Sequence, residues 1–294
     1  MLLRLALGLA ERIVSALPAN LAYALADTGG RVWYRSRRRR RLVAANLARV
    51  CTATGRAASG PAFERLVRRA FREHARYYLE LLRGPSYPLE RIRQLVTVRD
   101  WERHEATLRS GPTVLVGAHL GNFEPMGAYF AAHGIPVLSP IEEIRPAALF
   151  EFLRSRRGTG RGVEVVPLSK ARRPMIAMLR RGGAVGLIAD RDLAGDGLPV
   201  TFFGHPTTLP EGPAALVVLS DAAFLAGYCL RVGPDRFDCV GEPIEVERTG
   251  DRRTDVQALT RAMGEKLERQ IARAPEQWWG AFQPIWPDLG RAAE

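Results

Sequence analysis

Five short apolar runs alternate with helical patterns between residues 96 and 188, and this alternation constrains the fold more than any other feature. The runs are rich in β-branched residues, as buried strands are. They lie at 96–98, 113–117, 135–138, 163–166 and 184–188, with helical patterns at 100–109, 122–133, 146–157 and 171–181. Alternation of this kind predicts an α/β fold in which helices flank a central, mostly parallel or mixed sheet.

Later segments extend the same prediction. Residues 224–232, 236–240 and 244–246 are expected to be further strands, partly antiparallel, and 254–273 a final helix. The chain has no internal repeat and no phosphate-binding loop of the Gly-x-Gly-x-x-Gly or Walker type. These patterns predict that the 294 residues form one large α/β unit without a nucleotide-binding motif.

The first 84 residues have a different character. Amphipathic helical patterns at 2–16 and 62–83 surround an arginine run at 37–41. Apolar helices beside a basic run favour a face that lies on an anionic bilayer, where each arginine contributes on the order of 1 kcal/mol. The alternative is a solvated charge run on a helix that packs inward. We expect an N-terminal helical, membrane-associating region at 1–84 and an α/β core at 85–294, together one continuous domain.

Charge and hydropathy restrict the setting of the protein. The net charge is +12, nearly all of it from arginine, which favours acidic partners such as anionic lipids, phosphates or nucleic acid. No apolar run reaches the roughly 18 residues that a membrane-spanning helix needs. We expect a peripheral membrane protein with no cleaved signal.

The three cysteines argue against both a disulfide framework and a zinc site. Cys51, Cys229 and Cys239 are odd in number and include no close pair of the kind that binds metal. A reducing, cytoplasmic setting without a metal or a disulfide is the expectation.

His119 is the strongest candidate for a catalytic residue. It follows the strand predicted at 113–117, and the carboxyl ends of strands are where open α/β sheets place their ligands. Glu124 falls in the first turn of the next helix, close enough to orient the imidazole. The alternative is a structural histidine satisfied by the backbone, which is how we interpret His74 among its aromatic neighbours.

The string His119-Leu120-Gly121-Asn122-Phe123-Glu124 resembles the His-x-x-x-x-Asp/Glu motif of the lysophospholipid acyltransferase superfamily. Its form is similar to that of the lipid A (late) acyltransferase branch, which includes the phosphatidylinositol mannoside acyltransferases. Later stretches resemble further blocks of that branch in order and spacing, from about Leu2 to Trp286. These stretches lie at 142–146, 154–157, 188–192, 200–204, 210–214 and 275–279.

The resemblance implies a glycerolipid acyltransferase-like fold and an O-acyltransferase at the cytoplasmic face of the cell membrane. Such an enzyme moves a fatty acyl group from acyl-CoA or acyl carrier protein to a glycolipid hydroxyl. A phosphatidylinositol mannoside acceptor is favoured, with lipid A-type or lysophospholipid acceptors as alternatives. The acyl donor is a co-substrate, and no cofactor or nucleic-acid partner is expected.

The expected mechanism is general-base catalysis. His119 takes the hydroxyl proton while Glu124, hydrogen-bonded to the far ring nitrogen, fixes the tautomer, which supplies roughly 10²–10⁴-fold acceleration. Free backbone N–H groups of Gly121 and Asn122, at a helix start, are candidates to stabilise the oxyanion. No Gly-x-Ser-x-Gly elbow is present, so transfer without an acyl-enzyme is expected.

Further substrate-binding candidates come from the later blocks. The resemblance singles out Glu142 and Arg157. The trio Asp190, Arg191 and Asp192 follows a predicted strand and so faces the ligand edge, with a structural ion network as the alternative. The remaining expectation is an acyl tunnel walled in part by Phe202, Phe203 and the helix at 213–219.

Two other classes of function compete with acyl transfer. The net charge of +12 also suits a non-catalytic protein that binds nucleic acid or anionic surfaces. The charge is not interleaved with stacking aromatic residues, which disfavours nucleic acid. A lipid-surface glycosyltransferase or hydrolase is the third class, and the mass of the product distinguishes it.

Overall fold

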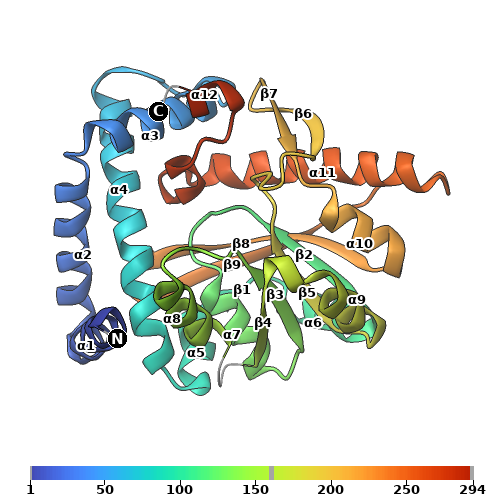
Figure 1. The fold of residues 1–294 in the computed structure, drawn as a ribbon, viewed down its shortest axis with the longest axis horizontal. Helices are drawn as coiled ribbons and strands as arrows, with labels where there is room; N and C mark the ends of the chain where they lie inside the picture. Colours follow the sequence, from blue (N-terminus) through green and yellow to red (C-terminus); the bar gives the residue numbers. More distant parts are fainter. Residues whose placement is uncertain (1, 159–161, 292–294) are drawn as a thin grey trace.

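The computed structural model in Figure 1 describes residues 2–158 and 162–291. A seven-stranded sheet forms its centre, in the order β1-β9-β8-β2-β5-β3-β4. Neighbouring strands are parallel except for β8 and β9, which are antiparallel. The strands are β1 (Val96–Val98), β2 (Thr113–Gly117), β3 (Val137–Ile141), β4 (Val163–Pro167), β5 (Ala184–Ile188), β8 (Ala223–Gly233) and β9 (Arg236–Pro243). The predicted α/β fold with a mostly parallel sheet is confirmed.

Helices cover both faces of the sheet. One face packs against α9 (Arg172–Arg180), α10 (Gly212–Ser220) and α11 (Arg252–Arg273) in a large apolar cluster. The opposite face packs against α5 (Leu89–Leu95), α6 (Trp101–Ser110) and α7 (Glu124–Ala132). This two-sided cover explains why the central strands read as continuous apolar runs rather than as alternating patterns.

The N-terminal helices stack at one end of the sheet (Figure 1). They are α1 (Leu2–Ala16), α2 (Ala19–Trp33), α3 (Arg37–Ala53) and α4 (Gly60–Arg83). The two helices α2 and α4 pack closely at Gly30, where a Cβ would lie 2.7 Å from the Cα of Arg72. The apolar face of α4 is buried as its periodicity predicts, and Phe71 joins the same cluster as the sheet residue Val114.

The C-terminal segment returns to the carboxyl edge of the strands. After α11 it forms the short helices η3 (Pro275–Gln277), η4 (Trp279–Phe282) and α12 (Pro287–Arg291). Trp278 and Trp286 are fully buried there. The backbone N–H of Trp279 donates to the carbonyl of His119 over 2.8 Å, so this segment holds the histidine loop in place.

A hairpin, one helix and two short turns complete the description. The hairpin of β6 (Leu198–Phe202) and β7 (His205–Leu209) forms a separate two-stranded sheet. The helix α8 (Ala147–Gly158) precedes β4, and the short turns η1 (Gly84–Ser86) and η2 (Leu168–Lys170) follow α4 and β4. No helix in the described ranges combines the length and the apolar character needed to cross a membrane.

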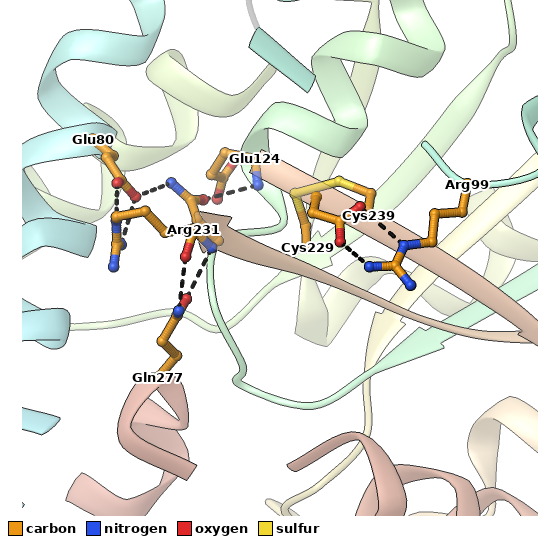
Figure 2. The surroundings of a disulfide bond; sticks show 9 residues. Glu80, Arg99, Glu124, Cys229, Arg231, Cys239 and Gln277 are labelled. Atoms are coloured by element: carbon orange, nitrogen blue, oxygen red, sulfur yellow. Dashed lines mark hydrogen bonds and ion pairs between the residues drawn. A yellow bond between two sulfur atoms is a disulfide. The ribbon is translucent and has the colours of Figure 1, made fainter. Parts of the chain in front are cut away.

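Cys229 and Cys239 form a disulfide, so the expectation of no disulfide is wrong (Figure 2). They are paired residues on the antiparallel strands β8 and β9, with their Cα atoms 4.1 Å apart. A separation of ten residues gives no sign of such closeness until the hairpin register is known. Cys51 is free and buried, as the core position of its helix requires.

Candidate active site

His119 and Asp190 occupy equivalent places beyond two neighbouring strands. Gly117 at the end of β2 is paired in register with Ile188 at the end of β5, and each functional residue follows two positions later. The parallel pairing therefore brings both side chains to one point at the carboxyl edge of the sheet. His119 Nδ1 lies 2.6 Å from Asp190 Oδ1, a hydrogen bond between ring and carboxylate.

Asp190 is held as a buried carboxylate. Its second oxygen accepts from the backbone N–H of His119 over 3.0 Å and from Trp278 Nε1 over 2.8 Å. Burial alone would raise the pKa of Asp190, but the charge of His119 and the hydrogen bonds from His119 and Trp278 outweigh it, so the pKa lies below its ordinary value. The His119 side chain is 21% exposed while that of Asp190 is 0% exposed.

This arrangement determines which ring nitrogen is available as a base. An ionised carboxylate only accepts hydrogen bonds, so Nδ1 carries the proton that it donates to Asp190. The neutral ring then presents the lone pair of Nε2. A partly exposed imidazole with a buried carboxylate behind it has the geometry of the His–Asp half of a catalytic triad.

The carboxylate that hydrogen-bonds the His119 ring belongs to Asp190, whereas the sequence suggested Glu124. Glu124 begins α7, where its backbone N–H donates to Asn122 Oδ1 over 3.0 Å, and it lines a cavity. Since Nδ1 of His119 contacts Asp190, the expectation that Glu124 orients the ring from that side is corrected. A role of Glu124 in catalysis stays a prediction.

A largely apolar cavity, open to solvent, lies next to the loop that carries the histidine. It lies between the sheet and the helices α5 and α7. It reaches Ala118 and Leu120, the residues on either side of His119. Its deeper lining includes Phe130, Val137 and Phe237. A partly exposed histidine next to an apolar cavity suits a substrate with one reacting polar end and a hydrocarbon tail.

Comparison with known proteins agrees with this geometry. Residues 5–286 match the family model of bacterial lipid A biosynthesis acyltransferases. The chain belongs to this family. It is an acyltransferase, and the family resemblance seen in the sequence is confirmed.

Two relatives of this acyltransferase are named phosphatidylinositol mannoside acyltransferase. The one from Mycobacterium tuberculosis (strain CDC 1551 / Oshkosh) is 32% identical over 282 residues, covering 93% of this chain and 85% of the relative. The one from Mycolicibacterium smegmatis is 29% identical over 282 residues, covering 94% of this chain and 88% of the relative. The predicted likeness to the mannoside enzymes is thus confirmed.

The predicted oxyanion donors of this acyltransferase are already bonded within the protein. The N–H of Gly121 donates to the carbonyl of Gln277 over 3.0 Å, and that of Asn122 to the carbonyl of Cys229 over 2.8 Å. Gly121 has φ 63°, and a Cβ there would lie 2.1 Å from the same Cys229 oxygen. The expectation that these amides are free is therefore wrong, and Gly121 is required by the close approach of β8.

Asn122 ties the histidine loop to a buried ion network. Its side-chain Nδ2 donates to Glu80 Oε2 over 2.8 Å. The same Glu80 oxygen accepts from Arg231 Nη2 over 2.8 Å, and Figure 2 shows Glu80, Arg231 and Gln277 gathered there. Gln277 Oε1 in turn accepts from the backbone N–H of Arg231 over 2.9 Å. The loop thus rests on α4, β8 and the C-terminal segment together.

The trio after β5 divides into three different roles. Asp190 contacts His119, whereas Arg191 Nη2 donates to Glu142 Oε2 over 2.7 Å at the surface. Asp192 accepts from the backbone N–H groups of residues 194, 195 and 197, and from Thr208 Oγ1, and so folds its own loop. Substrate binding by Glu142, Arg191 and Asp192 stays a prediction. The Arg157 side chain lies outside the described part of the chain.

The predicted tunnel residues lie on the wrong face of the sheet. Phe202 is 0% exposed and packs against Phe203 and Trp286. These rings and α10 belong to the cluster of α9 and α11, while the cavity opens on the face of α5 and α7. The alternative of ordinary core packing is the correct interpretation for Phe202 and Phe203. Chain order alone does not reveal on which face a helix packs.

A group of stacked aromatic rings from α4 and η4 contacts the histidine through Trp279. The ring of Trp279 lies 4.3 Å from that of His119 and stacks at 4.6 Å on Tyr77, measured between centroids. His74 stacks on the same tryptophan at 5.7 Å and is buried. Burial, together with the smaller effects of the charges of His119 and Arg39, lowers the pKa of His74 to about 3. His74 is a core residue, as expected.

Proposed function

We propose that this acyltransferase moves a fatty acyl group from acyl-CoA or acyl carrier protein to a hydroxyl group of a glycolipid. The observation that carries the proposal is the contact between His119 and Asp190, next to the apolar cavity that Ala118 and Leu120 line. A phosphatidylinositol mannoside is the favoured acceptor because the relatives bear that name. Lipid A-type and lysophospholipid acceptors are the alternatives.

The geometry supports direct transfer between two bound substrates. His119 Nε2 takes the hydroxyl proton of the acceptor as its oxygen attacks the thioester carbonyl carbon. The tetrahedral intermediate then collapses, the carbon–sulfur bond breaks, and the thiolate takes the proton from the imidazolium. The carboxylate of Asp190 stabilises the imidazolium between these steps. Histidine bases of this kind supply roughly 10²–10⁴-fold, or about 3–5 kcal/mol of barrier.

The surface of the N-terminal helices supports action at a membrane. Leu9 and Ile13 on α1, with Leu21 and Leu25 on α2, are each about half exposed or more. The arginine run at 37–41, exposed except for the half-buried Arg40, begins the next helix. Exposed apolar side chains beside cationic ones are the features by which peripheral helices bind anionic bilayers. We propose peripheral binding at the cytoplasmic face of the cell membrane.

The acyl-transfer proposal is tested by product mass. Purified protein is incubated with palmitoyl-CoA or palmitoyl carrier protein and, separately, with a phosphatidylinositol mannoside, a lipid A precursor and a lysophospholipid. A gain of one acyl mass on the mannoside, lost in His119→Ala and kept in His205→Ala, supports the proposal. No gain on any acceptor with either donor contradicts it, and a gain on another acceptor alone replaces the favoured one.

Membrane binding is tested by flotation with vesicles that contain anionic lipid. Because burying a leucine contributes about 1.5–3 kcal/mol, the double variant Leu21→Gln/Leu25→Gln is expected to lose about tenfold or more in binding. Leu219→Gln is the matched control, since Leu219 is equally exposed but lies on α10. Equal binding by the wild type and the double variant would contradict a membrane role for α2.

A further inference from the structure

Three glycines on adjacent strands line the apolar cavity. Gly227 of β8 lies beside Gly117 of β2, and Gly186 of β5 is paired in register with Leu115 of β2. Central strands of a sheet that is covered on both faces ordinarily carry large apolar side chains. Glycine weakens a strand interior because it fixes a flexible backbone and offers no side chain to pack, so each position needs a physical reason.

Neighbouring backbone supplies that reason at two of the three positions. A Cβ on Gly117 would lie 2.9 Å from the carbonyl oxygen of Gly227. A Cβ on Gly227 would lie 3.3 Å from the carbonyl oxygen of Val240. Both obstacles are strand backbone, which cannot move without disturbing the sheet, so close strand approach accounts for these two glycines.

No neighbouring atom of the residues that the structure describes accounts for Gly186. Within 4 Å its Cβ would meet only Val137 Cγ1, at 3.9 Å, which is ordinary van der Waals contact. Its backbone is that of a regular strand paired in register on β2. Gly186 is nevertheless only partly buried in the middle of the sheet, because it faces the cavity. A side chain at this position would project into that space.

Gly186 lies well inside the cavity rather than at its mouth. Its register partner Leu115 stands four residues before His119, so Gly186 is roughly 13 Å from the histidine along the strand direction. Two residues before Gly186 on β5, Ala184 pairs with Val137 of β3. Val137 and Phe130 are buried there and line the cavity beyond the glycine.

We propose that the missing side chain at Gly186 lets the cavity accept long fatty chains, so that this residue determines acyl-chain length. The inference rests on the proposed function, because it takes the cavity as the acyl site. A chain whose thioester lies at His119 passes Gly186 before it reaches Val137. A larger residue at Gly186 blocks that passage for long chains and leaves short chains, which end before it, unaffected.

The test is a competition among saturated acyl donors from octanoyl to stearoyl, each offered as the CoA thioester and as the carrier-protein thioester. Products on phosphatidylinositol mannoside are resolved by mass, and donor binding is measured in parallel without acceptor. In Gly186→Val we expect the ratio of stearoyl to octanoyl product to fall about tenfold or more, the scale on which apolar pockets discriminate methylene groups. Gly186→Ala is expected to show a smaller shift in the same direction.

Gly111→Val is the matched control, because it adds the same side chain at an extended glycine with no atom within 4 Å of its Cβ and outside the cavity lining. An unchanged chain-length ratio in both Gly186 variants, with wild-type transfer intact, overturns the inference alone. A wild type that neither binds nor transfers any donor overturns the proposed function instead. If Gly186→Val does not fold, the ratio in Gly186→Ala decides.

Discussion

His119 and His74 both contact the ring of Trp279, yet their surroundings differ in every other respect. His119 follows a strand, is partly exposed and hydrogen-bonds a buried carboxylate. His74 is in the middle of α4, is 6% exposed, and its Nδ1 has no hydrogen-bond partner among the described residues. The strand end gives one imidazole a charged partner and access to solvent, and the helix gives the other only aromatic rings.

The comparison shows that a histidine can act as a base when a carboxylate hydrogen-bonds one ring nitrogen and the other nitrogen is accessible to substrate. Its neighbours in sequence do not decide this. A buried ring without a carboxylate is held neutral, and it has no route to a substrate proton. A ring with Asp190 behind it has one defined tautomer and one nitrogen free to accept a proton. The following substitutions sharpen or break this contrast.

Replacing His119 should have the largest effect. His119→Ala removes the base, so we expect kcat to fall by about 10³–10⁴-fold, near the upper end for general-base catalysis. Steady-state transfer with saturating donor measures the loss. His205→Ala, on the hairpin of β6 and β7, is the control and should keep near wild-type kcat. A loss below tenfold in His119→Ala would mean that another group takes the proton.

Removing one hydrogen bond to Asp190 should have a smaller effect. Trp278→Phe deletes the indole donor to Asp190 Oδ2. The loss raises the pKa of Asp190 and leaves its carboxylate less firmly positioned against the His119 ring. We expect kcat to fall by about 10- to 100-fold, since one hydrogen bond to a charged group contributes about 1.5–3 kcal/mol. Trp286→Phe is the matched control: it is equally buried, but its indole donates to the carbonyl of Phe202.

Both tryptophan variants lose a buried hydrogen bond and some packing, so both should be destabilised by about 1–3 kcal/mol. Only Trp278→Phe should also lose activity per folded molecule. Thermal unfolding and kcat, measured on the same samples, separate the two effects. Equal losses of kcat in both variants would show that general destabilisation, rather than the hold on Asp190, limits the rate.

Replacing His74 should change acid stability and leave kcat near that of the wild type. Burial lowers its pKa to about 3 from 6.5, so between those pH values the unfolded chain binds a proton that the folded chain does not. The free energy of unfolding therefore falls as pH falls, by about 1.4 kcal/mol per pH unit from this group. His74→Phe should remove this contribution, as urea unfolding from pH 6.5 to pH 4 would measure. An unchanged slope would contradict the assignment.

Local patterns predicted the elements, and the pairing of elements supplied the rest. The alternation at 96–188 gave the α/β class, and the small residues after Val116 placed His119 at a strand end. The choice between Glu124 and Asp190 depended on strand order, because β5 lies next to β2 although β3 and β4 come between them in the chain. A spacing of five residues is visible in sequence, whereas a pairing across 71 residues is not.

The same limit applies to the cavity and to the C-terminal segment. The sequence does not distinguish apolar core residues such as Phe202 from apolar residues that line the cavity. The packing of the helices determines which face of the sheet borders the cavity. The donation of Trp278 to Asp190 spans 88 residues and depends on how the chain returns after α11. The predicted acidic partner was of the right chemical type, but long-range topology determined which residue it is.

The most direct test of the account compares Asp190→Asn with Glu124→Gln. An asparagine amide facing Nδ1 would favour the tautomer whose proton is on Nε2, which cannot accept the hydroxyl proton. We predict that Asp190→Asn lowers kcat by roughly 10²–10³-fold and that Glu124→Gln lowers it by about tenfold or less, because Asp190 still orients the ring. Loss in Glu124→Gln as large as in Asp190→Asn, or near wild-type kcat in Asp190→Asn, would contradict the claim that Asp190 makes His119 a base.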